Sequence, residues 1–138
     1  MKIINNIVLA LSGLALIHAC TMRLINPSAA VFLQSYFETA GNTLDRHIEL
    51  ASEIRGLGAS MLLAGVVAFL GIVKPRFRLT SFVVVSVIFV GVVLGRSISL
   101  VADGVPDASL LRPAVIEGIL AALNVVCLVR TFVEERKT

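Results

Sequence analysis

Long apolar stretches constrain this chain more than any other feature of its sequence. Four of them recur along the 138 residues, at Ile3 to Met22, Leu57 to Val73, Leu79 to Gly95 and Ala114 to Val133. A helix of about 20 mostly apolar residues crosses the roughly 30 Å hydrocarbon core of a bilayer. Because the second and third stretches can lengthen at their polar ends, we expect spans at about 3–24, 54–73, 79–101 and 113–133. The pattern predicts an all-α integral membrane bundle of four transmembrane helices, folded as one domain over residues 1–138.

The composition supports that fold class. Hydrophobic residues make up 57% of the chain and charged residues 15%, with a mean hydropathy of +0.96, whereas soluble domains have roughly 45–50% and about 25%. The Val- and Ile-rich run from Phe82 to Leu94 is also expected to be a helix, because a helix satisfies its backbone groups within one segment in lipid. The net charge of +3 is dispersed and has no aromatic platform beside it, so we expect a lipid bilayer and no nucleic acid as the surroundings.

The distribution of basic residues predicts an orientation, because cytoplasmic loops are enriched in Lys and Arg. Placing the N-terminus inside puts seven Lys and Arg residues inside and five outside, and the turn from Lys74 to Arg78 is basic with no acidic residue. We therefore expect a multi-pass protein with both termini in the cytoplasm. The first apolar run is longer than the roughly 7–15 residues of a signal-peptide core, so we expect it to be a retained helix.

Turn and cap residues predict how the spans are connected. Asn26-Pro27 is a helix start signal, which predicts a short helix over Ala29 to Phe37 on the outer surface, between the first and second spans. In the other outer connection, Asp103-Gly104 is a turn signal. Pro113 suits the first turn of the fourth helix.

Charged residues gather at one edge of the apolar spans and are the main hint of function. Charge beside lipid is costly, so such side chains usually face the bundle interior and need partners. At about 1.5 Å per residue, the members of this set should share one layer near the outer face. The set comprises Glu53, Arg55, Arg96, Asp103, Glu117 and His18.

Two interpretations of this charged set stay open at the level of sequence. In the first, the residues form an outer-leaflet binding site in which Arg55 or Arg96 holds an anionic group, or Glu117 and His18 relay protons. In the second, two ion pairs, Arg96 with Glu117 and Arg55 with Asp103, fasten the helix ends, and long arginine side chains reach toward the headgroups.

Small residues at helical spacing predict close packing. On the second span they are Gly56, Ser60 and Ala64, and on the third they are Gly91, Gly95 and Ser99. Small residues let membrane helices approach closely. The simplest assembly places these two faces together, with the second and third helices in close contact.

The remaining polar and sulfur residues predict no metal, no cofactor and no catalytic motif. A metal site needs three or four converging ligands, and no second histidine lies at ligand spacing from His18. Cys20 lies near the outer face and Cys127 lies about 21 Å into the fourth helix. A disulfide requires Cα atoms within about 7 Å, so we expect these cysteines to pack as small apolar residues.

Several motifs together resemble a bacterial four-helix membrane family catalogued as domain of unknown function 4345. They are Glu53-Ile54-Arg55-Gly56, the basic turn Lys74 to Arg78, the run Gly95-Arg96-x-x-Ser99-x-x-x-Asp103-Gly104-x-Pro106, and Glu117. The second helix departs from the family pattern at Ala59-Ser60, where the family has a Gly-Gly pair. The resemblance implies four membrane helices and a bacterial inner membrane. It implies no activity.

Two main functional hypotheses follow. The first is a non-enzymatic inner-membrane protein, either an accessory subunit of a larger membrane complex or a small homo-oligomer, acting through helix packing. The second is a binder or carrier of a small amphiphile, such as a lipid or quinone, or of an anion, at the charged set. An enzyme using Glu117 or His18 for proton transfer ranks below both, because no catalytic geometry can be derived from the sequence.

Overall fold

The fold was obtained as a computed structural model that describes residues 2–27, 48–106 and 108–136. In this part of the chain there are four long helices: α1 (Lys2–Ile25), α3 (Ile48–Val73), α4 (Arg78–Ala102) and α5 (Ala108–Glu135). A short 3-10 helix, η3 (Pro75–Phe77), connects α3 to α4. The all-helical prediction is therefore confirmed for the described residues.

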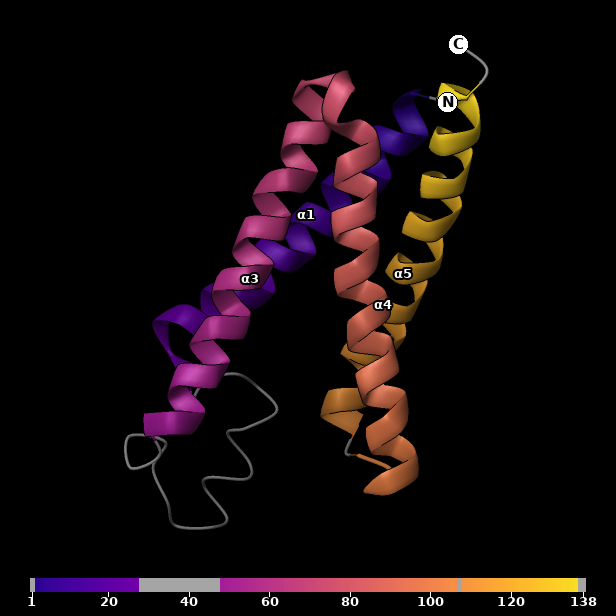
Figure 1. Ribbon diagram of the computed structural model, residues 1–138. Coiled ribbons are helices and arrows are strands. Elements are labelled where there is room, and N and C mark those ends of the chain that lie inside the picture. Colours follow the sequence, from indigo (N-terminus) through magenta and orange to yellow (C-terminus); the bar gives the residue numbers. More distant parts are fainter. Residues whose placement is uncertain (1, 28–47, 107, 137–138) are drawn as a thin grey trace.

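The helices run up and down, so the chain has two distinct ends. The α3–α4 connection lies at the same end as the start of α1 and the finish of α5, whereas α3 and α5 begin at the opposite end (Figure 1). We refer to these as the hairpin end and the distal end. Toward the distal end, the pair α1–α3 and the pair α4–α5 diverge (Figure 1).

The helices α1 and α3 form the closest helix pair, and glycines make this possible. A Cβ atom added at Gly65 would lie 2.9 Å from Ile17 Cγ1 and 3.2 Å from the carbonyl oxygen of Gly13. At Gly58 it would lie 3.0 Å from Arg23 Cβ. Small residues bring the backbones of membrane helices close enough for dispersion contacts to accumulate. The tight interface of this bundle is therefore between the first and second long helices.

The helices α3 and α4 meet at the hairpin end. The Ser81 hydroxyl donates to the carbonyl oxygens of Val67 at 2.6 Å and Phe77 at 2.9 Å. Gly71 lies directly against Ser81, and a Cβ atom there would come within 2.6 Å of Ser81 Cβ. A serine that is fully buried among apolar groups thus has its hydroxyl satisfied by backbone carbonyls.

The sequence-based packing assignment needs correction at several positions. Ala64 is buried, but a Cβ added at Gly56, Gly91 or Gly95 would meet no atom of the described residues within 4 Å, and Ser60 and Ser99 are exposed. The residues in close contact are Gly13, Gly58, Gly65 and Gly71. Helical spacing defines a face but does not say which neighbour covers that face. The stripe on α4 is left uncovered by the described chain because the helix pairs diverge toward the distal end (Figure 1).

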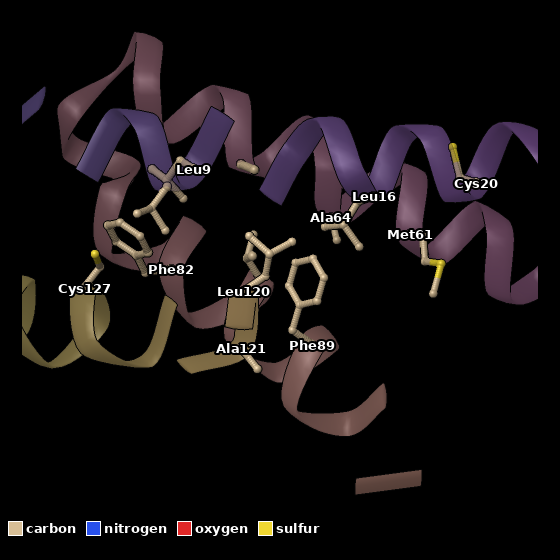
Figure 2. Close-up of a cluster of buried hydrophobic side chains, with 13 residues drawn as sticks. Leu9, Leu16, Cys20, Met61, Ala64, Phe82, Phe89, Leu120, Ala121 and Cys127 are labelled. Atoms are coloured by element: carbon tan, nitrogen blue, oxygen red, sulfur yellow. The ribbon is translucent and has the colours of Figure 1, made fainter. Parts of the chain in front are cut away.

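The core occupies the middle and hairpin side of the bundle. Phe82 and Phe89 of α4 point toward Leu9 and Leu16 of α1, and Leu120, Ala121 and Cys127 of α5 close the cluster (Figure 2). Cys20 and Cys127 lie at opposite ends of this cluster and are both unbridged (Figure 2). On α4 and α5, buried residues stop at Phe89 and Leu120, so the distal parts of these helices lie outside the core.

The outer surface of the bundle is apolar. Each long helix contains a span that is long and apolar enough to cross a membrane, at Lys2–Ile25, Leu50–Val73, Pro75–Ala102 and Leu110–Glu135. Only 28–39% of the most apolar window in each span is buried within the bundle. Such a continuous exposed apolar surface is typical of a protein that contacts lipid.

One helix boundary differs from the expected one. The helix α5 begins at Ala108, so Pro113 lies inside it and beyond its first turn. The chain therefore returns toward the bundle before Pro113, after a turn in which Gly104 adopts a φ of 97° that favours glycine. The short helix expected over residues 29–37 falls outside the described residues.

Candidate functional site

The strongest polar contact between two helices is an ion pair at the distal side of the core. Arg96 of α4 places Nε 2.6 Å from Oε2 of Glu117 on α5, and its Nη2 donates to Oε1 at 3.2 Å. Only the Nη2–Oε1 contact has hydrogen-bond geometry, so the pair combines one charge-assisted hydrogen bond with a close ionic contact between Nε and Oε2. The side chains are 24% and 19% exposed, so both are largely withdrawn from the surface. The predicted pairing of these two residues is present in the structure.

A second arginine, which is not among the charged residues singled out from the sequence, lies near this pair. Arg23 of α1 is half-buried, its Nη1 donates to the carbonyl oxygen of Ala19 at 2.9 Å, and it interacts electrostatically with Glu117 and Arg96. Its position in the same layer as the other charges is the signal that would have identified it. The charged groups drawn together in the described chain are thus Arg23, Arg96 and Glu117.

A cavity of about 190 Å³ lies between all four long helices on one side of the ion pair. Glu117 and Pro113 of α5, Ala19 and His18 of α1, and Met61 of α3 are among its lining residues. The remaining lining is apolar and includes Phe89, Leu16 and Leu120, which form the distal edge of the core. We refer to this space as the central cavity.

A second cavity of about 220 Å³ lies between α4 and α5 on the other side of the pair. Arg96, Ser97 and Ser99 supply its polar lining, and Pro106, Leu110 and Ala114 belong to its apolar lining. We refer to this space as the α4–α5 cavity. The ion pair therefore separates two apolar cavities, with its carboxylate at one and its guanidinium at the other.

Buried polar side chains connect α1 with α5 on the hairpin side of the central cavity. Asn124 Nδ2 donates to Ser12 Oγ at 2.7 Å and to the carbonyl oxygen of Leu120 at 2.7 Å. One level closer to the hairpin end, Asn5 Nδ2 donates to Thr131 Oγ1 at 3.4 Å. We refer to these two contacts as the polar seam. Both asparagine side chains thus donate a hydrogen bond between helices.

The other charged residues singled out in the sequence lie apart from the ion pair. Glu53 and Arg55 are exposed on α3, and Asp103 accepts a hydrogen bond from Ser99 Oγ at 2.7 Å within its own helix end. The expected pair of Arg55 with Asp103 is absent from the described residues, so that prediction was wrong. The two residues belong to helix pairs that diverge toward the distal end, where both of them lie (Figure 1). His18 does line the central cavity beside Glu117, as its depth predicted.

Among residues 2–27, 48–106 and 108–136, no three His, Cys, Asp or Glu side chains converge as metal ligands would. The local chemistry is therefore that of a charged pair between apolar walls. It can hold a molecule with one apolar part and one polar group.

The fold and this site define a class of protein: an all-helical bundle whose four described helices each have the length and apolarity of a membrane span. More particularly, the chain belongs to the family described as Domain of unknown function (DUF4345), whose model matches residues 4–128. The resemblance predicted from the sequence motifs is thereby confirmed. No curated protein and no solved structure shows significant similarity to the chain.

Proposed function

We propose that this chain is a non-enzymatic protein of a bacterial inner membrane that binds one small amphiphile at the Arg96–Glu117 pair. The observation that carries the proposal is the position of this pair between two cavities whose lining is mainly apolar. Charge inside a membrane bundle is retained mainly where it serves a pathway or a ligand. A pair that merely fastened two helices would not need a cavity on each side.

The size of the cavities limits what part of a ligand they hold. An apolar cavity of about 150 Å³ is large enough for benzene, so cavities of about 190 and 220 Å³ each suit a single ring or a short alkyl segment. The polar group of such a ligand would lie at the ion pair. Quinone headgroups and short amphiphilic lipids have this combination of a compact ring or chain and one polar group.

The surface charge supports an orientation in which both termini lie in the cytoplasm. Lys74 and Arg76 are exposed at the hairpin end, and the basic guanidinium of Arg78 donates to Asn6 Oδ1 of α1 at 3.3 Å. The start of α1 and the finish of α5 lie at this same end (Figure 1). The excess of basic residues in cytoplasmic loops then favours cytoplasmic termini. The charge pair and the cavities would lie toward the outer leaflet.

Native mass spectrometry of the protein, released from its membranes in a mild detergent, tests this proposal. We expect the wild-type chain to carry one small amphiphile that is lost from Arg96→Gln. Arg112→Gln is the matched control, because Arg112 is an exposed arginine of α5 that lines neither cavity. Absence of a bound small molecule in the wild type, or equal retention in Arg96→Gln, would reject the proposal.

One observation favours a second candidate function, that of a subunit acting through helix packing. Gly91 and Gly95 of α4 lie on one face with open space around both positions. Such a face can receive another membrane helix, from a second copy or from a different subunit. This candidate predicts a stoichiometric protein partner in the same mass spectra.

Leucine substitutions separate this second candidate from the first. Gly91→Leu and Gly95→Leu should prevent assembly by filling the face. Gly118→Leu, at an equally open glycine of α5, should leave assembly intact. Unchanged assembly in both α4 variants would count against packing at this face.

A further inference from the structure

The polar seam between α1 and α5 follows a strict spacing. On α1 its residues are Asn5 and Ser12, and on α5 they are Thr131 and Asn124, so each helix contributes a polar side chain every seven residues. In an antiparallel pair, equal steps along both helices keep opposite residues facing each other. Leu16 lies four residues after Ser12, and Leu120 lies four residues before Asn124, so these two residues also occupy opposite positions. Both are core residues that line the central cavity. The two hydrogen-bonded contacts are thus successive levels of one repeat.

The next level of this repeat is incomplete. Seven residues beyond Ser12 is Ala19, and seven residues before Asn124 is Glu117. Both line the central cavity. At the first two levels each helix offers a polar group, but here α1 offers only a methyl group, and the cavity occupies the space between the two positions. Glu117 therefore faces no polar side chain on α1 at its own level, and its α1 interaction is an electrostatic one with Arg23, four residues further along that helix.

The carboxylate of Glu117 has capacity for a further hydrogen bond. A carboxylate offers about four lone-pair sites on two oxygens. Arg96 donates a hydrogen bond to Oε1, whereas the buried Oε2 is in ionic contact with Nε but has no hydrogen-bond partner among the described residues. His18 lines the same cavity but makes no hydrogen bond to Glu117 in the described structure. An acceptor that faces an apolar cavity is completed most simply by a donor from whatever fills that cavity.

We propose that the ligand of the central cavity donates a hydrogen bond from a hydroxyl group to Glu117, in the place that a polar side chain at position 19 would occupy. This inference rests on the proposed function and narrows its ligand to one chemical class. That class is an apolar ring or short chain bearing a neutral hydroxyl, as in a phenol, a quinol or a long-chain alcohol. The ring or chain lies against Leu16, Phe89 and Leu120.

Two probes test this inference. 4-Hexylphenol has a hydroxyl group that can donate a hydrogen bond, and 4-hexylanisole has no such donor because a methyl group replaces the hydroxyl hydrogen. Calorimetric titration into nanodiscs containing the protein, corrected with empty nanodiscs, measures saturable binding of each. A hydrogen bond to a charged acceptor contributes enough that we expect the phenol to bind about ten- to a hundredfold more tightly.

A substitution at Ala19 tests whether the ligand hydroxyl lies opposite this residue. Ala19→Asn supplies an internal donor at the incomplete level, as Asn5 does at the first, and should remove the preference for the phenol. Ala10→Asn makes the same change on α1 at a position that does not line the central cavity, and should keep the preference. Retained folding of both variants is checked by protection of the buried Cys20 and Cys127 from maleimide.

The outcomes separate this inference from the proposed function. Equal binding of both probes, abolished by Arg96→Gln, would overturn the hydroxyl donor and leave the amphiphile site standing. A preference for the phenol that persists in Ala19→Asn would overturn its placement opposite Ala19. Absence of saturable binding of either probe to the wild type would overturn both.

Discussion

Asn124 Nδ2 of α5 lies 2.7 Å from Ser12 Oγ of α1, and both residues are fully buried. The contact joins α5 to α1, and so the pair α4–α5 to the pair α1–α3. Direct contacts between α1 and α5 are otherwise few compared with those between α1 and α3. The polar seam therefore joins the two helix pairs on the α1–α5 side, in addition to the larger α3–α4 interface at the hairpin end.

A double-mutant cycle should detect this connection. We expect Ser12→Ala and Asn124→Leu to show a coupling free energy of about 0.6 kcal/mol, and at most about 1.7 kcal/mol, as for other hydrogen bonds between membrane helices. The effect stays modest because Asn124 Oδ1 has no donor among the described residues, so leucine also removes an unsatisfied group. Reversible unfolding in mixed micelles measures it, and additive single effects would contradict it.

Breaking the Arg96–Glu117 pair from either side should destabilise the protein, and neutralising both residues should recover part of the loss. Removing one partner of a fully buried pair costs roughly 3–5 kcal/mol because the other charge is left uncompensated. We expect a smaller cost for Arg96→Gln or Glu117→Gln, since both side chains remain about a fifth exposed. Unfolding midpoints of the two single variants and the double variant decide this. A double variant less stable than either single variant would show that the residues stabilise the fold independently.

Alanine substitutions at two glycines should have opposite effects. Gly71→Ala places a methyl group against Ser81 and 3.2 Å from Leu9 Cδ1, so we expect overpacking to cost about 1–3 kcal/mol. Gly118→Ala meets open space, and the lower backbone entropy of alanine should stabilise α5 by about 0.5–1 kcal/mol. Thermal unfolding of the two variants measures the contrast. Equal tolerance at both positions would mean that α3 and α4 separate more readily than their contact indicates.

Cysteine labelling should establish the orientation. The native cysteines Cys20 and Cys127 are buried, so the wild type provides an unreactive background. In intact spheroplasts we expect an impermeant maleimide to label Val105→Cys, at the exposed distal turn, but not Lys74→Cys, at the exposed hairpin end. Lys74→Cys should react after permeabilisation. The reverse pattern would place the termini outside.

Much of the architecture was predictable because it depends on local patterns in the sequence. Runs of apolar residues set the number and the approximate limits of the helices, and Asp103-Gly104 marked the turn after α4. The pairing of Arg96 with Glu117 was also predictable, because depth along two helices places both residues in the same layer. These inferences require only the helical rise and the cost of charge in lipid.

The lateral arrangement was harder to predict. Sequence spacing placed Gly91 and Gly95 on one face but could not show that no described neighbour covers it. It likewise could not separate Arg55 from Asp103, because residues at one depth can belong to helices that diverge. Nor did it reveal Ala19 as a cavity-lining position, because an alanine in an apolar helix carries no polar signal.

The seven-residue spacing of the polar seam also has a consequence for how the helices find their alignment during assembly. Lipid chains are as apolar as leucine, so sliding α1 along α5 by one turn would change the burial of apolar surface very little. It would, however, place Asn124 opposite Val8 or Leu16 and leave its amide without Ser12. In a bundle where hydrophobicity cannot discriminate between such registers, two pairs of small polar side chains select one of them, much as a single buried asparagine does in a coiled coil.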